Sequence, residues 1–284
     1  MQYSCLHTHT AYCDGKGSPD EFCAEAYKNG FVSIGFSAHA PISHKTGYST
    51  EWHLQPGDFE KYCACIRETA KRWDGKLKVF LGLEVDYIKD TICAKDWDAE
   101  KNNLDYLIGS VHYLNATKCV DSDQAEFQEL INNDFSGDVT AILDAYWDNV
   151  ETMLQIGGID IFAHPDIVKK NNKGNKYFNE NDDHYKERVR RVADILADLK
   201  IVTEVNTGGM IRLHLAEPYP SRYFLGLLKK NNVPVMINSD AHCPEHLSGH
   251  YETARTLLQE CGYTKIVYFQ GRSCGKAIWK EGLL

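Results

Sequence analysis

Short apolar runs alternate along the chain with segments whose apolar residues recur at helical spacing. This alternation is typical of repeated strand and helix units around a parallel sheet. The runs predict strands at 2–8, 31–37, 78–84, 106–112, 159–164, 201–206, 233–239 and 265–270. We therefore expect an α/β fold, in which residues at the carboxyl ends of the strands gather on one face.

Four amphipathic segments predict helices between the strands. The first begins at Ser18-Pro19-Asp20-Glu21, a capping box with proline at the first helical position. The other three are marked by apolar residues at helical spacing: Phe59, Cys63, Ile66, Ala70 and Trp73; Val139, Ile142, Leu143, Tyr146, Val150 and Met153; and Val189, Val192, Leu196 and Leu199. We expect Gly157-Gly158 to end the helix over 139–153.

Two segments interrupt this rhythm, and both are predicted to be long loops. One spans 115–136, and the other is the Asn- and Lys-rich stretch 171–183. Long loops in compact barrels are often lids or substrate walls, and simple solvated insertions are the equally good alternative. With no internal repeat and no low-complexity linker, the 284 residues are interpreted as one domain spanning 1–284.

Composition and charge exclude several classes of protein. A net charge of −9 argues against a nucleic-acid-binding surface, which needs clustered Lys and Arg, but it allows a small phosphorylated substrate. The start of the chain has no basic leader or apolar core of a signal peptide, and no run reaches the about 18 apolar residues of a membrane span. We expect a cytoplasmic protein with ten reduced cysteines, and the sequence does not indicate its oligomeric state.

Candidate chemistry lies at the carboxyl ends of the predicted strands. Two carboxylates close such runs, Glu84 after KVFLGL and Asp240 after VPVMINS. Six of the twelve histidines occupy similar positions: His7, His9, His39, His112, His164 and His242. A lone histidine after a strand is usually a structural, hydrogen-bonded residue, but six at equivalent positions indicate a shared site.

The spacing of these residues favours metal binding. His7-Thr8-His9 directs two imidazoles to the same side, because side chains repeat their direction every second residue along a strand. Asp240-Ala241-His242 repeats that geometry with a carboxylate. Imidazole and carboxylate, without cysteine at matching positions, favour Zn, Mn or Fe over a structural thiolate zinc site.

The chain resembles the polymerase-and-histidinol-phosphatase (PHP) family, and within it the histidinol-phosphatase branch. The segments that carry this resemblance are HTHTAYCDG, GFSAHAP, GLEVDY, DYLIGSVH, FAHPDIVKK, EVNTGGMIR and NSDAH, in this order over nearly the whole chain. The resemblance implies a distorted seven-stranded (β/α) barrel with two to three divalent ions at the carboxyl ends of the strands.

The resemblance also implies three sets of metal ligands. The first set is His7, His9, Glu84 and Asp240; the second is Glu84, His112 and His164; the third is His39, His242 and a residue from the loop after the first strand. In many relatives that last ligand is a histidine six positions beyond the second histidine of the HxH motif. Here that position is Gly15, so we take the neighbouring Asp14 as the substitute, its alternative role being that of a turn residue.

These ligands point to phosphoester hydrolysis. Divalent cations lower the pKa of bound water, so that a hydroxide bridging the ions can attack phosphorus without a serine or cysteine nucleophile. Asp240, Arg212 and His44 are the catalytic candidates. Arg212 follows a glycine pair and is predicted to clamp the phosphate, the alternative being a surface arginine paired with Glu217.

Two further residues complete the predicted substrate site. His44 is expected to protonate the leaving alcohol or to contact the substrate. Asn206 is expected to orient the substrate or a residue behind the ligands, its alternative role being that of a turn former. The resemblance implies L-histidinol phosphate as substrate, hydrolysed to L-histidinol and phosphate in histidine biosynthesis. The alternatives are phosphotyrosine or a nucleotide phosphate as substrate, or a metal-binding module without catalysis.

Overall fold

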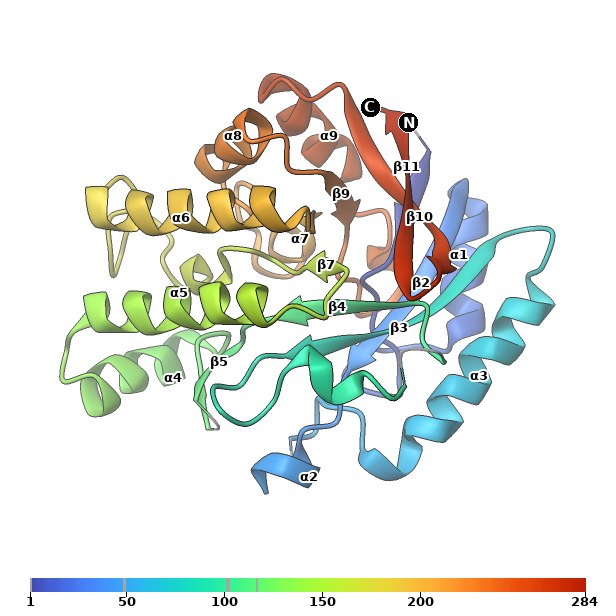
Figure 1. Cartoon of the computed structure of the whole chain (residues 1–284), viewed down its shortest axis with the longest axis horizontal. Coiled ribbons are helices and arrows are strands. Elements are labelled where there is room, and N and C mark those ends of the chain that lie inside the picture. The colour runs from blue at the N-terminus through green and yellow to red at the C-terminus, as the bar shows by residue number, and fades with distance from the viewer. Residues whose placement is uncertain (1, 48–49, 101–102, 116) are drawn as a thin grey trace.

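The fold is a nearly closed barrel of seven parallel strands (Figure 1). The computed structural model describes residues 2–47, 50–100, 103–115 and 117–284, without the side chains of Ser43 and His44. In spatial order the strands are β1 (Tyr3–Cys5), β2 (Phe31–His39), β3 (Lys78–Asp86), β4 (Tyr106–Ser110), β7 (Ile161–Phe162), β8 (Val202–Asn206) and β9 (Val235–Asn238). Just beyond β1 and β9, Thr8 pairs in parallel with Ala241 and brings the two ends of the sheet together.

Helices surround the barrel (Figure 1). They are α1 (Pro19–Lys28), α2 (Ser43–Thr46), α3 (Phe59–Arg72), α4 (Gln124–Glu129), α5 (Val139–Ile156), α6 (Asp183–Leu199), α7 (Gly208–Leu213), α8 (Arg222–Lys230) and α9 (Tyr251–Glu260). All four predicted helices are present. Ser18 caps α1 in a capping box, and α5 ends at Gly157 with a φ of 73°.

The barrel strands face two different cores. Residues that alternate outward, such as Phe36, Leu83 and Leu107, pack against the helices. Residues that alternate inward, such as Phe80, Tyr106 and Ile108, fill the barrel itself. Because a strand repeats its direction every second residue, the inward set fixes which side chains point into the barrel further along each strand.

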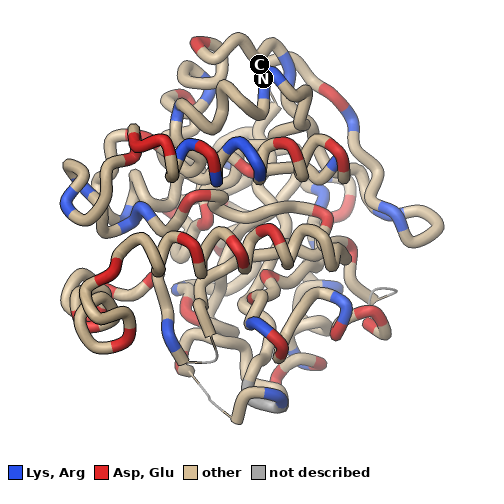
Figure 2. Tube along the Cα trace, turned by 60° about the vertical axis from the view of Figure 1, so that its left-hand side comes forward, with Lys and Arg blue, Asp and Glu red and all other residues tan. Residues whose placement is uncertain are grey.

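The predicted strand at 265–270 is present, but it is not part of the parallel barrel. Here β10 (Lys265–Ser273) pairs antiparallel with β11 (Lys276–Leu283), a strand that was not predicted. Val267 and Phe269 of β10 join the inner cluster together with Phe80 and Tyr106, so this hairpin closes the amino-terminal end of the barrel. The start of β1 and the end of β11 lie side by side (Figures 1 and 2).

The segment 115–136, predicted as a long loop, contains regular secondary structure, so this prediction is wrong. Within it lie β6 (Lys118–Cys119), paired with β5 (Tyr113–Asn115), then α4 and a π-helical turn at Leu130–Asp134. The side chain of Asp123 caps α4 by accepting hydrogen bonds from the backbone of Ala125 and Glu126. In contrast, 171–183 is irregular up to the first residue of α6, as predicted.

Lys and Arg are interspersed with Asp and Glu along the chain (Figure 2). Along α5 and α6, arginines of one helix pair with acids of the other, for example Arg191 with Glu151 at 2.6 Å. The ten cysteines are all in described parts of the chain, and all are free. Among the described residues, no helix has the length and apolar character that crossing a membrane requires.

Candidate metal centre

The inward face of the barrel changes from apolar to polar along each strand. On β3 the inward series Phe80, Gly82, Glu84, Asp86 passes from an aromatic ring to two carboxylates, and the series that starts at Tyr106 on β4 continues beyond the strand to His112. The carboxyl end of the barrel is therefore lined with ionisable groups, whereas its amino-terminal half is a hydrophobic core.

Glu84 lies at the centre of this polar end and is fully buried. Its two carboxylate oxygens lie within 3.6 Å of a ring nitrogen from each of five histidines. The distances are 3.0 Å to His7 Nε2, 3.4 Å to His9 Nε2, 3.1 Å to His39 Nδ1, 3.6 Å to His112 Nε2 and 3.0 Å to His164 Nε2. These rings come from or follow four different strands, so the parallel register of the barrel is what gathers them.

A second group of side chains lies beside Glu84, nearer the surface. His9, Asp14, His39 and His242 offer ligand atoms that all lie within 4.8 Å of one another. Asp14 Oδ2 is 3.0 Å from His242 Nε2, and the Asp14 side chain is 29% exposed. The structure thus brings Asp14 to the position that the third predicted ligand set requires, although Asp14 precedes the position that holds histidine in many relatives.

Asp240 connects the two groups. Its Oδ1 lies 3.3 Å from His9 Nε2 and 3.6 Å from His7 Nε2, and these three residues form another potential metal-binding group. The backbone of Asp240 has a φ of 50°, and that of His164 has a φ of 22°, a region that residues other than glycine rarely adopt. Such conformations persist only where surrounding contacts hold them, and they concentrate at functional sites.

Burial and the close approach of carboxylates and imidazoles shift the pKa values of the cluster in opposite directions. Burial alone would lower the pKa of His7, but Glu204, Glu84 and Asp240 raise it well above its usual value. Burial would raise the pKa of Glu84, yet the surrounding histidines hold it well below the usual range. Burial lowers the pKa of His39 to about 3, whereas Asp86 overcomes burial and raises the pKa of His112 to about 10.

The donor set fits divalent metal ions. His9 Nε2 and His39 Nδ1 are buried and lie near Glu84, but they make no hydrogen bond of acceptable geometry within the described structure. His112 Nε2 and His164 Nε2 face each other at 3.1 Å. Buried nitrogens without partners are costly, and an ion can use lone pairs that no proton donor reaches. Imidazole nitrogen with carboxylate oxygen suits Zn, Mn or Fe.

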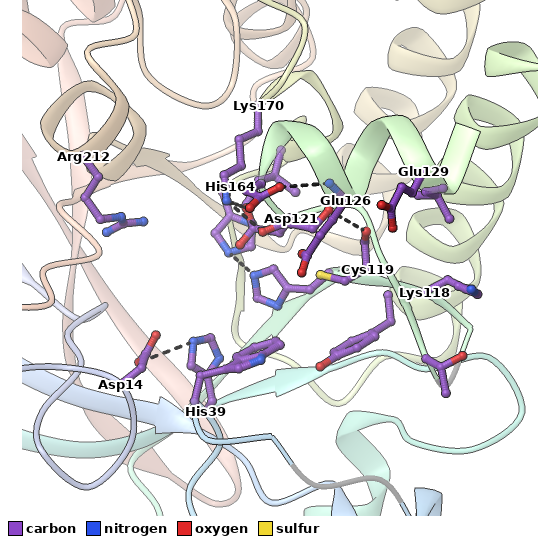
Figure 3. A pocket seen from close by; sticks show the side chains of 18 of the residues that line it. Asp14, His39, Lys118, Cys119, Asp121, Glu126, Glu129, His164, Lys170 and Arg212 are labelled. Atoms are coloured by element: carbon purple, nitrogen blue, oxygen red, sulfur yellow. Dashed lines mark hydrogen bonds and ion pairs between the residues drawn. The ribbon is translucent and has the colours of Figure 1, made fainter. Parts of the chain in front are cut away.

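A cavity of about 840 Å³ opens above the cluster (Figure 3). Asp14, His39, Glu84 and Asp240 form part of its floor. Arg212 points into it from α7, opposite the segment that contains Glu126 and Glu129 (Figure 3). The segment 115–136 therefore is a wall of the cavity, which was one of its two predicted roles.

Arg212 lines the cavity and is held in place by Asp240. Its guanidinium donates to Asp240 Oδ2 at 2.9 Å and also to the backbone oxygen of Asp240, and its side chain is 35% exposed. Asp240 raises the pKa of Arg212 despite burial, so the group stays charged. The alternative pairing with Glu217 is absent, since Glu217 bonds to Lys169 instead.

The other predicted substrate contacts differ in outcome. Asn206 is fully buried and does not line the cavity; its amide donates to Glu204 at 2.7 Å, and its oxygen accepts from the backbone of Gly208. Asn206 thus lies behind the ligands and also forms the turn after β8, which agrees with two of its three predicted roles and not with a substrate contact. His44 belongs to α2, but its side chain lies outside the described residues.

Three residues at the site were missed from the sequence. Asp86 bonds His112, Glu204 bonds His7, and His53, which does not follow any predicted strand, is buried and bonds Asp86. A signal existed for the two acids. Asp86 lies two residues after Glu84, and Glu204 two residues before Asn206, so alternation along β3 and β8 turns them into the barrel.

Gly15 allows a test of the unusual third ligand. A Cβ atom at this position would lie 2.2 Å from the backbone oxygen of His9, a contact that backbone atoms cannot relieve cheaply. We expect Gly15→His to distort the turn and to lower the metal content, instead of supplying the ligand that relatives have there. We expect Gly15→Ala to destabilise the protein by about 1–3 kcal/mol, measured by denaturant unfolding.

Gly57→Ala is the matched control, since nothing lies within 4 Å of a Cβ at Gly57 and its φ is not positive. This control should have nearly unchanged stability. A Gly15→His protein that binds more metal than the parent chain would contradict the argument.

Comparison with known proteins agrees with this architecture. The PHP domain family model matches residues 6–208. The chain is 27% identical to the histidinol-phosphatase of Bacillus subtilis over 278 residues, which cover 92% of this chain and all of that protein.

Two solved structures share the fold. One is the histidinol phosphate phosphatase of Lactococcus lactis in complex with zinc, L-histidinol and phosphate, with a TM-score of 0.65 at 19% identity over 98% of this chain and 99% of the other. The other is a Listeria monocytogenes protein described as a candidate histidinol phosphatase, with a TM-score of 0.77 at 18% identity over 88% of this chain and 99% of the other. At sequence identities this low, the similarity to these two structures supports the fold and not the function. Taken with the match of the family model over most of the chain, the barrel and its motifs lead to one conclusion: the chain belongs to the PHP domain family.

Proposed function

We propose that the chain is a metal-dependent phosphomonoesterase that hydrolyses L-histidinol phosphate to L-histidinol and phosphate. The observation that supports it most is the convergence of five histidine rings on the carboxylate of Glu84 at the floor of a large cavity. The relatives that match over nearly their whole length are named histidinol-phosphatases, and the Lactococcus lactis relative binds L-histidinol, phosphate and zinc.

The residues that hold the ions are proposed as three sets. They are His7, His9, Glu84 and Asp240; Glu84, His112 and His164; and Asp14, His39 and His242, for two to three ions of Zn, Mn or Fe. Bound ions supply two things here, a lowered pKa of water and an offset to the negative charge of the phosphoryl group. Glu84 is proposed to be shared between two sets, because its two oxygens face different histidines.

The chain's own residues position the phosphate ester. Arg212 is proposed to donate two parallel hydrogen bonds to the phosphate, since its guanidinium lines the cavity and is held by Asp240. The alcohol part of the ester then extends toward the segment 115–136, which forms the opposite wall. His44 stays a proposed proton donor or substrate contact.

Exchange of Arg212 for lysine is expected to reduce kcat/KM for the ester by about 10²-fold, because lysine keeps the charge but lacks the planar fork that grips two phosphate oxygens. Initial rates and bound metal should be measured on the same preparation. Arg222→Lys is the control, because Arg222 pairs with Glu260 on the surface. Unchanged kinetics in Arg212→Lys would remove Arg212 from the substrate site.

The substrate is tested by phosphate release from a panel of esters. With the metal-loaded protein, histidinol phosphate should give the highest kcat/KM, above phosphotyrosine and nucleoside monophosphates. If histidinol phosphate ranks among the poorest of them, the substrate assignment fails while the phosphoesterase proposal stands. A metal-replete protein that cleaves none of them would instead favour the metal-binding module. We also propose a cytoplasmic location, which the ten free cysteines favour.

A further inference from the structure

Two buried carboxylates that are not among the proposed ligands lie directly behind the histidine cluster. Asp86 is the last residue of β3, and Glu204 is in the middle of β8. Both are almost completely inaccessible to solvent. Neither lines the cavity, so neither has direct access to a substrate. Burial of a charged carboxylate costs free energy of folding, so a buried carboxylate that does not contact the substrate must be stabilised by other contacts.

Glu204 holds the far side of the His7 ring. Its oxygens lie 3.0 and 3.1 Å from His7 Nδ1, while His7 Nε2, on the other side of the ring, faces Glu84 at 3.0 Å. Glu204 is itself fixed by three more donors, the backbone of His164 at 2.8 Å, Asn206 at 2.7 Å and Asn238 at 2.8 Å. All of its neighbours therefore donate to it.

Asp86 holds His112 in the same manner. Its Oδ1 lies 2.7 Å from His112 Nδ1, and His112 Nε2 faces Glu84 at 3.6 Å. The other oxygen of Asp86 lies 3.0 Å from His53 Nε2, and the opposite nitrogen of His53 bonds the hydroxyl of Thr50. Asp86 is thus fixed between two rings, one of which faces the cluster.

The chemistry of a carboxylate determines what these contacts do. An ionised carboxylate can only accept hydrogen bonds, so the ring nitrogen that faces it must carry the proton. Once an ion has displaced the proton from the opposite nitrogen, Nε2, the lone pair of Nε2 is directed at that ion, because the remaining proton is held on Nδ1 by the carboxylate. In contrast, His164 Nδ1 makes no hydrogen bond in the described structure, so this arrangement is not shared by every histidine of the site.

We propose that Glu204 and Asp86 are positioning residues of the metal centre, which fix the tautomer and orientation of His7 and His112 so that Nε2 of each ring is presented to an ion. This inference rests on the proposed metal-dependent function. It assigns to Glu204 and Asp86 no contact with the ion or with the substrate.

The test is a metal titration that needs no substrate. The metal-free protein is titrated with Zn²⁺ in competition with a chromophoric chelator, and with Co²⁺ by visible absorption. Glu204→Gln places an amide donor among groups that all donate, and is expected to weaken the binding step to which His7 contributes by about 10–100-fold. Asp86→Asn is expected to weaken the step to which His112 contributes within the same range of about 10–100-fold. At saturating metal the number of bound ions should be unchanged.

Glu151→Gln is the matched control, because Glu151 is also a buried acid but pairs with Arg188 and Arg191 on the outer helices. It should bind metal as the parent chain does, even where its melting temperature falls. The same pattern in Glu204→Gln and Asp86→Asn, a lower melting temperature of the metal-free protein with unchanged metal affinity, would overturn the proposal.

Loss of a whole equivalent of metal at saturation in Asp86→Asn would also overturn it, by making Asp86 a ligand beside His39 and His112, a grouping that the geometry allows. Should one variant fail to fold, the other decides, since each carboxylate serves a different ring. A parent chain that binds metal but does not hydrolyse histidinol phosphate would disprove the proposed function. The metal titration would still test the role of Glu204 and Asp86, because it needs no substrate.

Discussion

Replacement of Glu84 by glutamine is expected to lower kcat for histidinol phosphate by at least about 10³-fold, corresponding to about 4 kcal/mol of transition-state stabilisation. Glutamine has nearly the same size, so packing in the barrel is kept. It has, however, one carbonyl oxygen and one amide group in place of two anionic oxygens. Since both oxygens of Glu84 face histidine nitrogens at 3.0 Å, the amide would point its hydrogens at atoms that should bind an ion.

The measurement combines steady-state kinetics with elemental analysis of the purified variant. We expect less bound metal as well as the fall in kcat, because Glu84 is shared by two of the proposed ligand sets. Glu151→Gln, a buried acid distant from the cluster along the chain and paired with arginines, should keep both values. A metal content and a kcat within a factor of about 3 of the parent chain's values would show that Glu84 is no ligand. For kcat, that factor corresponds to less than about 0.7 kcal/mol of activation free energy.

Removal of the divalent ions is the second change from which we expect a very large effect. Chelation followed by gel filtration should leave a folded protein that releases no phosphate above background, and Zn²⁺ or Mn²⁺ should restore the rate. No serine or cysteine nucleophile is proposed for this site, so the metal-free chain should hydrolyse the ester many orders of magnitude more slowly than the metal-loaded chain. Enzymes in general accelerate their reactions by about 10⁶-fold or more.

Reloading should depend on pH in a defined direction. Carboxylates raise the pKa of His7 and His112 in the metal-free protein, so ions must displace protons from these rings. Metal affinity is therefore expected to increase as the pH rises, with release of protons that a weakly buffered titration detects. Full activity after exhaustive chelation, with metal absent by elemental analysis, would disprove the mechanism.

Much of the fold was predictable because its signals are local. The capping box at Ser18 and the glycine pair after α5 each mark a helix boundary through the chemistry of adjacent residues. The strand at 265–270 shows the limit of such signals. Its apolar run is the same whether the strand joins a parallel barrel or forms a hairpin beneath it, and only the contacts of Val267 and Phe269 with the inner core distinguish the two.

The candidate site was predictable to the extent that its residues end strands. His39 and Glu84 follow apolar runs and were recognised as members of a set of residues at equivalent positions, whereas His53 lies in an irregular segment and reaches Asp86 only through folding. Glu204 looks like the polar half of an ordinary alternating strand. Its role depends on His7, 197 residues earlier in the chain, and no local pattern records that contact.

The hairpin of β10 and β11 has a practical consequence. It places both chain ends at the amino-terminal mouth of the barrel, whereas the cavity opens at the carboxyl mouth. A fusion partner or an immobilisation tag joined to either end would therefore leave substrate entry unobstructed. Trimming of the last strand, in contrast, would remove Trp279, uncover Phe269 at the base of the barrel and make the enzyme prone to aggregate.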